Sequence, residues 1–297
     1  MSAEVDRYRT HSRWSDPGPF APQLRAIPPD PPQVQRAVSN LLIHPMIAPH
    51  RGISVPEAAT QDRNIRSVES ILALLAERGS ADLTAPRPPE ARAWCVCAGF
   101  ARVATAVFRT HGLPGRCRAG FAAYFNPGFF EDHWVCEYWD GTAWHLLDAQ
   151  LDDEALREDA ISFTPWDVPR DQFVDGSTAW RRTRAGELDT SVFGLSPLGL
   201  IGAWFVAGNV LLDAAALNKE EMLPWEKWSI GRELATRRIV PAEWNERLDQ
   251  VAATLAGSPD GAVAERVYRG HPWLRVTPTL LSFADGAPVE VESGVPA

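Results

Sequence analysis

Residues 97–111 constrain the fold of this chain most, because their apolar side chains recur at helical spacing and cover nearly every side of the segment. Phe100, Ala104 and Val107 form one apolar stripe, and two arginines supply only a narrow polar edge. A helix without a broad polar face has to be surrounded by the rest of its domain. We therefore expect this helix to lie at the centre of a globular core.

Strand patterns follow this helix. Residues 116–125 predict one strand, and residues 133–139 and 142–148 predict two more on either side of Asp140-Gly141. An Asp-Gly pair between two such runs is a strong signal for a hairpin with a two-residue turn. A central helix combined with an antiparallel sheet places the chain in the α+β class.

The expected hairpin brings two ionisable side chains to one face of the sheet. Counting outward from a two-residue turn puts His133 directly opposite Asp148, with Cβ atoms about 4.5–5.5 Å apart. A carboxylate in that position can hold an imidazole in one tautomer and stabilise its cation. His145 has the opposite parity and faces away, so His133 is the candidate base. The inference depends on register, because a slip of one residue turns a side chain to the other face.

The regions before and after this helix and hairpin differ in composition. Seven prolines between residues 17 and 32 exclude regular helix there and favour extended chain on the surface, which predicts a proline-rich arm over residues 1–58. A catalytic core is expected over residues 59–165. It begins with a helix at residues 61–78 that Thr60 can cap.

Residues 166–297 are predicted to form a mostly helical region packed on that core, with short strands in the tail. Its expected helices span residues 198–217, 225–236 and 241–256. The first of these includes part of an uncharged run, residues 190–212, that is long enough to span a membrane. A proline and four glycines interrupt the run. We expect a buried helix there, begun by Ser196-Pro197 as its N-cap and first residue.

Charge and cysteine content exclude several classes of protein. The chain has 29 Lys and Arg against 38 Asp and Glu, a net charge of −9, which disfavours a nucleic-acid partner because phosphates need a positive surface. The polar start of the chain shows no apolar signal segment. Four cysteines in 297 residues are too few for a small disulfide scaffold. These features predict a bacterial-type cytoplasmic protein with no membrane partner.

Cys97 stands where the central helix begins and is the candidate nucleophile. Unpaired N–H groups and the helix dipole at that end favour a thiolate over a thiol, and a neighbouring imidazolium adds to this effect. The backbone N–H of Cys97 can supply one donor of an oxyanion hole, and Trp94 is a candidate for the second. Cys95 and Cys97 alone do not make a structural zinc site, which needs four ligands.

The chain resembles the core of the transglutaminase-like superfamily over residues 60–165. The resemblance is carried by Cys97-Ala98-Gly99-Phe100-Ala101, Gly112-Leu113-Pro114-Gly115-Arg116, His133-Trp134 and Trp144-His145-Leu146-Leu147-Asp148. It implies a papain-like α+β core with a central helix and an antiparallel sheet. It also gives Cys97 the nucleophile's place, His133 the base's and Asp148 the orienting acid's. Gly99 departs from the family, many of whose members have a polar residue two positions after the cysteine.

The three residues together predict acyl transfer on an amide or a thioester through a thioester on Cys97. The thioester would be resolved by water or by an amine, as in an amidase, a peptidase or an amide-forming acyltransferase, and no metal or organic cofactor is expected. The partner would be a small molecule or a peptide that carries the amide or thioester. The alternative is a catalytically silent binding or scaffold protein with the same fold. The sequence leaves the acyl donor, the acceptor and the oligomeric state open.

Other polar residues have two interpretations. Cys117 and Cys136 fall in strands and are expected to act as small core residues. Arg116 either binds a substrate carboxylate or forms a structural ion pair. Asn209 and Asp213 share one face of an apolar helix, where they form either a satisfied polar network or part of the acyl-acceptor pocket.

Overall fold

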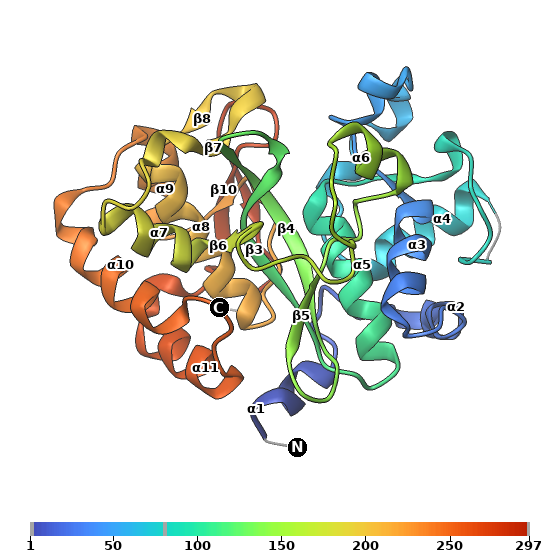
Figure 1. Ribbon diagram of the computed structural model, residues 1–297, viewed down its shortest axis with the longest axis horizontal. Coiled ribbons are helices and arrows are strands. Elements are labelled where there is room, and N and C mark those ends of the chain that lie inside the picture. The colour runs from blue at the N-terminus through green and yellow to red at the C-terminus, as the bar shows by residue number, and fades with distance from the viewer. Residues whose placement is uncertain (1–2, 80–81, 296–297) are drawn as a thin grey trace. The chain divides into compact units, whose positions relative to one another are not determined.

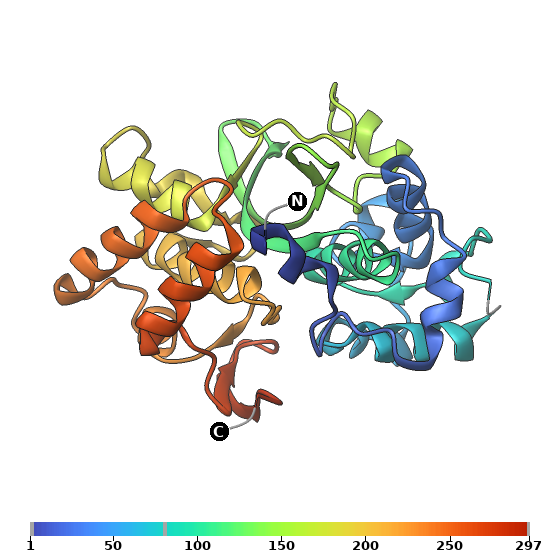
Figure 2. The ribbon, with the colours of Figure 1, turned by 90° about the horizontal axis from the view of Figure 1, so that it is seen from below.

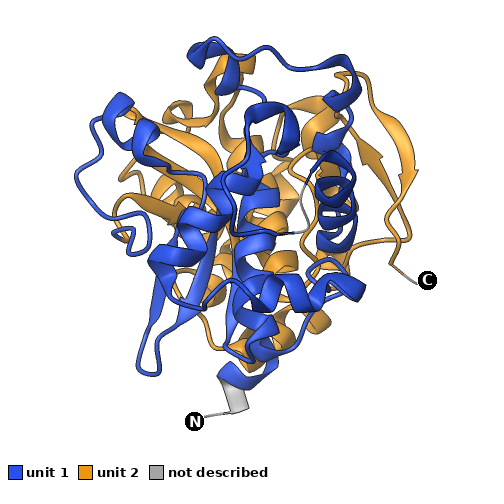
Figure 3. Ribbon diagram, turned by 90° about the vertical axis from the view of Figure 1, so that its right-hand side faces the viewer, with its two compact units in different colours: residues 1–117, 134–169 blue, residues 118–133, 170–297 orange. Residues whose placement is uncertain are grey.

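The structure is a computed structural model that describes residues 3–79 and 82–295. The chain folds into two compact units (Figure 3): residues 1–117 with 134–169, and residues 118–133 with 170–297. The polypeptide passes between the units three times along its length, twice within strands of one sheet. The domain boundaries expected at residues 58/59 and 165/166 stay a prediction.

The first unit is built around α5 (Cys97–Thr110), whose residues 97–109 are all buried. α2 (Ala21–Arg25), α3 (Pro31–Leu41) and α4 (Val68–Arg78) pack on it (Figure 1). The expected helix over residues 97–111 is therefore confirmed to within one residue. Its central position follows from its lack of a polar face.

The expectation that residues 17–32 contain no regular helix is wrong. Pro22 stands at the start of α2, and Pro31 and Pro32 open α3. A proline in the first turn leaves no hydrogen bond unmade, because the N–H groups there have no partner within the helix. Leu24 of α2 and Val34 of α3 are fully buried in the same apolar cluster as α4 and α5. These prolines therefore begin packed helices.

The helix expected at residues 61–78 begins later than predicted. Residues 62–64 form a single 3-10 turn, and α4 starts at Val68. The side chain of Ser67 accepts the N–H of Ser70 and caps this helix, so Thr60 is not its cap. The shorter elements of this unit are α1 (Ala3–Asp6), α6 (Asp153–Glu158) and the parallel pair β1 (Leu42–Ile43) and β2 (Ala93–Trp94).

A six-stranded sheet has the order β6-β3-β4-β7-β8, and β5 also pairs with β4. Its strands are β3 (Gly115–Asn126), β4 (Phe129–Trp139), β5 (Trp144–Leu147), β6 (Phe173–Asp175), β7 (Phe193–Leu195) and β8 (Leu200–Ile201). The strands expected near residues 116–125 and 133–139 are confirmed. The sheet is not wholly antiparallel, because β4 and β7 run parallel. The fold is mixed α+β.

The second unit contains most of the C-terminal helices: α7 (Gly176–Arg184), α8 (Ala203–Leu217), α9 (Ile230–Arg237), α10 (Ala242–Leu255) and α11 (Gly261–Gly270). α8 packs on α7 and α9, and α10 and α11, drawn in orange tones in Figures 1 and 2, pack on each other. The tail adds β10 (Thr279–Ser282) and β11 (Val289–Glu292), which form a second sheet with β9 (Glu226–Lys227). The mostly helical character and the short tail strands agree with the sequence patterns, and α11 was not expected.

Two of the C-terminal helices begin later in the structure than the sequence predicted. Leu200 and Ile201 pair with β7, and Gly199 and Gly202 adopt positive φ angles of 63° and 113° on either side of them. Such angles end helical geometry and suit glycine, so α8 begins at Ala203 and Ser196-Pro197 opens only a 3-10 turn. Similarly, the helix expected at residues 225–236 starts only at Ile230, after β9.

The uncharged run at residues 190–212 is divided between β7, β8 and the start of α8. Over residues 3–79 and 82–295, no helix has both the length and the apolar character needed to cross a bilayer.

Candidate active site

Cys97 is the first residue of α5, and its side chain is nearly buried, with 6% exposed. Val96 is the N-cap residue, and its apolar side chain cannot accept a hydrogen bond from the N–H groups of the first turn. The thiol thus stands beside the first turn of a helix, where the N–H groups lack partners within the helix. This is the placement that the sequence predicted for the nucleophile.

Close packing against Cys95 explains why residue 99 is a glycine. A Cβ atom built on Gly99 would lie 2.7 Å from Cβ of Cys95, a distance that real Cβ atoms do not adopt. The polar residue that many transglutaminase-like proteins have at this position would therefore collide with Cys95. The departure from the family pattern follows from local packing beside the first turn of α5.

Asp148 follows the last residue of β5 and is fully buried. Its backbone N–H donates to the carbonyl of Pro165 at 2.7 Å, and its Oδ1 accepts the N–H of Gln150 at 2.9 Å. These bonds fix the carboxylate at the end of the strand. Cys97 and Asp148 both belong to the first unit.

His133 lies on β4 and belongs to the second unit. The residue is 2% exposed. Its imidazole packs edge-on against two aromatic rings, with centroid distances of 5.0 Å to Phe125 and 6.1 Å to Tyr124. Two aromatic neighbours restrict the orientation of the imidazole. His133 therefore belongs to a different unit from Cys97 and Asp148.

The predicted direct pairing of His133 with Asp148 is wrong. Cys136 pairs with Leu147 and Trp139 with Trp144, so β5 is shifted by two residues along β4 relative to a two-residue turn. The connection is a four-residue loop, residues 140–143. Asp140 closes this loop, because its Oδ1 accepts the N–H of Thr142 at 2.6 Å and of Ala143 at 2.8 Å. The Asp side chain thus selected a longer loop than the Asp-Gly pair suggested.

The other cysteines are also buried, as reduced thiols. Cys117 and Cys136 lie 3.4 Å and 3.3 Å from Oγ1 of Thr105 inside the first unit. Burial raises the pKa of Cys95 and of Cys136 to about 12. Neither thiol carries appreciable thiolate near neutral pH.

We expect iodoacetamide to label Cys97 at least about tenfold faster than Cys95 or Cys136 at pH 7. The thiolate is the reacting form, and the raised pKa of Cys95 and Cys136 leaves little thiolate on those two residues. Mass spectrometry with fragment ions can separate Cys95 from Cys97 on one tryptic peptide. Cys95→Ala should keep the fast label and Cys97→Ala should lose it. Equal, slow labelling of all four thiols would contradict the assignment of Cys97 as nucleophile.

His145 binds two carboxylates at the end of the hairpin. Nδ1 lies 2.9 Å from Oδ1 of Asp167 and Nε2 lies 3.0 Å from Oδ2 of Asp140. The hydrogen bond with Asp167, followed by that with Asp140, raises the pKa of His145 above its ordinary value. His145 is half-buried and holds the loop to the following segment, which suits a structural role.

Trp94 ends β2, three residues before Cys97, and its side chain is 1% exposed. Its indole Nε1 has no hydrogen-bond partner within the described part of the chain. A buried N–H without a partner is costly. The indole of Trp94 therefore stays a candidate for the second oxyanion-hole donor.

Arg116 and Asp213, for which the sequence left two interpretations open, both form buried ion pairs. Arg116 donates to Glu137 at 2.6 Å with both side chains fully buried, and its guanidinium lies 4.1 Å from the ring centroid of Trp144. In the second unit, Asp213 accepts Nε and Nη2 of Arg118 at 2.9 Å and 2.8 Å. These contacts favour a structural ion pair for Arg116 and a satisfied polar network for Asp213.

Asp132, next to His133 on β4, carries a perturbed carboxyl group that the sequence did not single out. Nδ2 of Asn209 donates to its Oδ1 at 3.0 Å. Burial raises the pKa of Asp132 from 3.8 to about 6, although Asn209 and Lys227 act in the opposite direction. Strand alternation puts Asp132 on the opposite face from His133. Asp132 stands out only through its contact with Asn209 of α8, which is distant in sequence and could not be predicted from local patterns.

The raised pKa of Asp132 predicts a loss of stability as pH rises. The folded chain holds the proton more tightly than the unfolded chain between pH 4 and 6, so the free energy of unfolding falls across that window. Asp132→Asn removes this titration, and from pH 4 to pH 7 it should gain on the order of 1–3 kcal/mol relative to wild type. Urea denaturation at both pH values measures the gain.

Asp189→Asn provides a control of opposite sign. Hydrogen bonds from Ser191 lower the pKa of the exposed Asp189, so this variant should lose stability relative to wild type as pH rises. A difference between wild type and Asp132→Asn that does not change with pH would show that Asp132 titrates normally.

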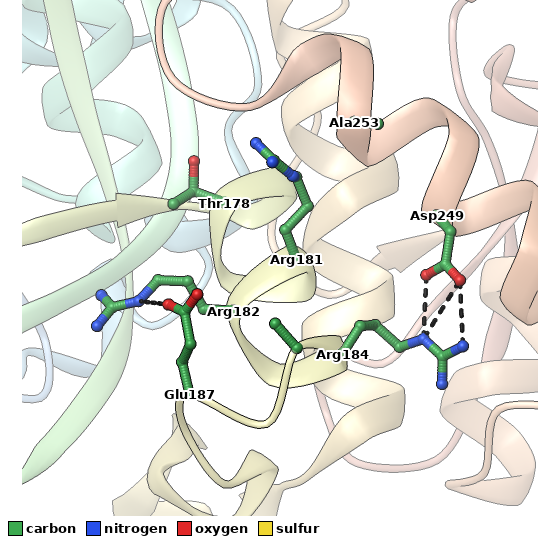
Figure 4. A pocket seen from close by; sticks show the side chains of 8 residues that line it. Thr178, Arg181, Arg182, Arg184, Glu187, Asp249 and Ala253 are labelled. Atoms are coloured by element: carbon green, nitrogen blue, oxygen red, sulfur yellow. Dashed lines mark hydrogen bonds and ion pairs between the residues drawn. The ribbon is translucent and has the colours of Figure 1, made fainter.

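A pocket of about 400 Å³ in the second unit lies between α7 and α10 (Figure 4). Arg184 pairs with Asp249 at 3.0 Å and Arg182 pairs with Glu187 at 3.4 Å. The lining contains no cysteine and no histidine. This pocket therefore offers no thiol or imidazole for the proposed chemistry, and its carboxylates are paired with arginines.

No family model and no curated protein matches this sequence. Among solved structures, the chain is similar to a protein from Cytophaga hutchinsonii described as a "putative cysteine protease". The two share 17% sequence identity, the match covers 50% of this chain and 43% of that chain, and the TM-score is 0.34. The match thus spans less than half of that protein, and a likeness at this level assigns no activity to this chain.

Proposed function

We propose that this chain is a cysteine-dependent acyl-transfer enzyme with a transglutaminase-like core. The observation that carries the proposal is the position of Cys97 as the first residue of the buried helix α5. Cys97 acts as nucleophile, His133 as base and Asp148 as the acid that orients His133. The substrate is a small molecule or peptide that carries an amide or a thioester.

The pairing of β4 with β5 bears on the choice of base. One step beyond the last observed pair, Cys136 with Leu147, Val135 comes opposite Asp148. His133 precedes Val135 by two residues and shares its face of β4. This alternation supports His133, rather than its neighbour Asp132, as the partner that the proposal gives to Asp148.

The reaction has two steps. The Cys97 thiolate attacks the carbonyl carbon and forms a C–S bond, and His133 holds the thiol proton. The bond from the carbonyl carbon to the leaving group then breaks, and His133 protonates the leaving amine or thiol. Water or an amine next attacks the thioester and passes a proton to His133. The C–S bond breaks and the thiolate is restored.

Each remaining group has one task in these steps. The backbone N–H of Cys97 and the unpartnered indole N–H of Trp94 would stabilise the oxyanion of each tetrahedral intermediate. Asp148, buried and fixed by Gln150 and Pro165, holds the tautomer of His133 and stabilises its cation.

Intact-mass spectrometry tests the proposal with a panel of peptide glutamine amides, aryl amides and acyl thioesters of N-acetylcysteamine. A donor that acylates the wild-type chain should add the mass of one acyl group, and Cys97→Ala should show none. Cys95→Ala is the matched control and should still be acylated. An adduct that persists in Cys97→Ala would refute the assignment. No adduct from any donor would favour a catalytically silent binding protein.

A further inference from the structure

A pocket of about 600 Å³ lies in the second unit, and none of the residues assigned to acyl transfer lines it. It is formed by the start of α8 and the segment that joins α9 to α10. Its lining includes Ile201, Trp204, Arg238, Ile239, Val240 and Asn245. We call it the Trp204 pocket. Its volume falls in the range of about 300–1,000 Å³ that is usual for small-molecule sites.

The pocket presents a cation that no carboxylate neutralises. The Arg238 guanidinium lies 5.9 Å from the ring centroid of Trp204, and within residues 3–79 and 82–295 Arg238 has no ion-pair partner. Arg237, just before it, pairs instead with Glu233 at 2.6 Å. Arg238 adopts the left-handed conformation with φ of 55°, which costs about 1 kcal/mol or more for a non-glycine residue.

A second polar group faces the same space. The half-buried Asn245 of α10 lines the pocket, and its amide has no hydrogen-bond partner in the described part of the chain. Guanidinium and amide N–H groups together match the two oxygens of a carboxylate. The open first turn of α8, whose N-cap Gly202 makes no side-chain cap, adds a favourable dipole.

The rest of the pocket is apolar and partly open to solvent. Ile201, Ile239 and Val240 line it beside the half-buried ring of Trp204. Ile239 is 47% exposed, and Leu198, next to the lining residue Gly199, is 62% exposed. Leu198 and Ile239 are two of the four large hydrophobic side chains that are exposed in the described chain. Exposed apolar groups gathered at a cavity mark a binding site more often than a packing defect.

We propose that the Trp204 pocket binds a small organic acid, a monocarboxylate with an aromatic or branched apolar body. The carboxylate is held by Arg238 and Asn245, and the apolar body packs on Ile201, Ile239 and Val240. One guanidinium and one amide suit a single negative charge, and the apolar lining disfavours a free phosphate. This site does not depend on the chemistry assigned to Cys97.

Isothermal titration of the Cys97→Ala chain with 3-phenylpropionate tests this site without any acyl chemistry. We expect saturable binding of one ligand per chain. The uncharged analogue 3-phenylpropanol, acetate and inorganic phosphate should each bind at least about tenfold more weakly, because each lacks the charge, the apolar body or both features in the required shape. The proposal would be overturned if 3-phenylpropanol bound as tightly as 3-phenylpropionate. It would also be overturned if 3-phenylpropionate did not bind at a concentration of about 10 mM.

Two neighbouring arginines locate the binding. Arg238→Gln should weaken binding of 3-phenylpropionate at least about tenfold, because the charge-assisted hydrogen bonds are lost. Arg237→Gln, a matched change one residue away, should leave the affinity within about twofold. Thermal melting of both variants checks that each is folded. The same loss in both variants, or a loss in neither, would place the ligand elsewhere.

Discussion

Replacing Asp148 with asparagine is expected to slow acylation of Cys97 by about 10³- to 10⁴-fold while the chain stays folded. The carboxylate is fully buried, and its Oδ1 accepts the N–H of Gln150. An asparagine oxygen can still accept that hydrogen bond, so the fold keeps its contact. The amide cannot stabilise the imidazolium form of His133, and it favours the wrong tautomer. Single-turnover intact-mass measurements with the best acyl donor give the rate, and thermal melting checks the fold.

A second histidine and its carboxylate supply the matched control. His145 lies 2.9 Å from Asp167 in the first unit, which is another His–Asp pair outside the proposed triad. His133→Gln should abolish acylation, whereas His145→Gln and Asp167→Asn should change its rate by less than about threefold. If His145→Gln were as damaging as His133→Gln, the choice of base would be wrong.

Replacing Asp213 with alanine is expected to lower the free energy of unfolding by about 3–5 kcal/mol. Arg118 and Asp213 are both fully buried and share two hydrogen bonds, and Oδ1 of Asp213 also accepts the N–H of Ala119 at 3.0 Å. Removing the carboxylate leaves the Arg118 guanidinium buried, with Oδ1 of Asp175 at the longer distance of 3.6 Å. Urea denaturation followed by circular dichroism measures the loss.

An exposed ion pair gives the comparison. Arg269 and Glu265 pair on α11, with the arginine side chain 77% exposed, and Arg269→Gln should cost less than about 1 kcal/mol. The double variant Arg118→Met with Asp213→Leu should recover part of the stability lost in Asp213→Ala, because apolar side chains leave no buried charge. A loss below 1 kcal/mol in Asp213→Ala would mean that the pair is not desolvated.

Local patterns were enough to predict the central elements. α5 could be read from residues 97–111 because a helix that is apolar on most sides has no alternative to the core. β3 and most of β4 followed from runs of β-prone residues beside Gly and Pro. Cys97 was singled out because the start of a helix can be recognised from sequence alone. These inferences needed only short-range geometry.

The errors arose where a side chain or a glycine changed local geometry in ways that residue type alone does not reveal. Asp140 could serve a two-residue turn or cap a four-residue loop, and its bonds to Thr142 and Ala143 chose the second. Pro31 could break a helix or begin one, and it begins α3. Gly199 and Gly202 delayed the start of α8. In each case the residue tolerates two conformations, and packing selects between them.

Local patterns in the chain predict a central buried helix with a cysteine at its start, followed by strands with a histidine and an aspartate. The partners of the buried charges become visible only in the folded chain. Arg118 meets Asp213 and Asp132 meets Asn209, although many residues separate each pair in the chain. Helical and strand periodicities report which side chains point inward. A buried charge, however, is satisfied by whichever partner the fold brings to it, and that choice depends on contacts that no local pattern encodes.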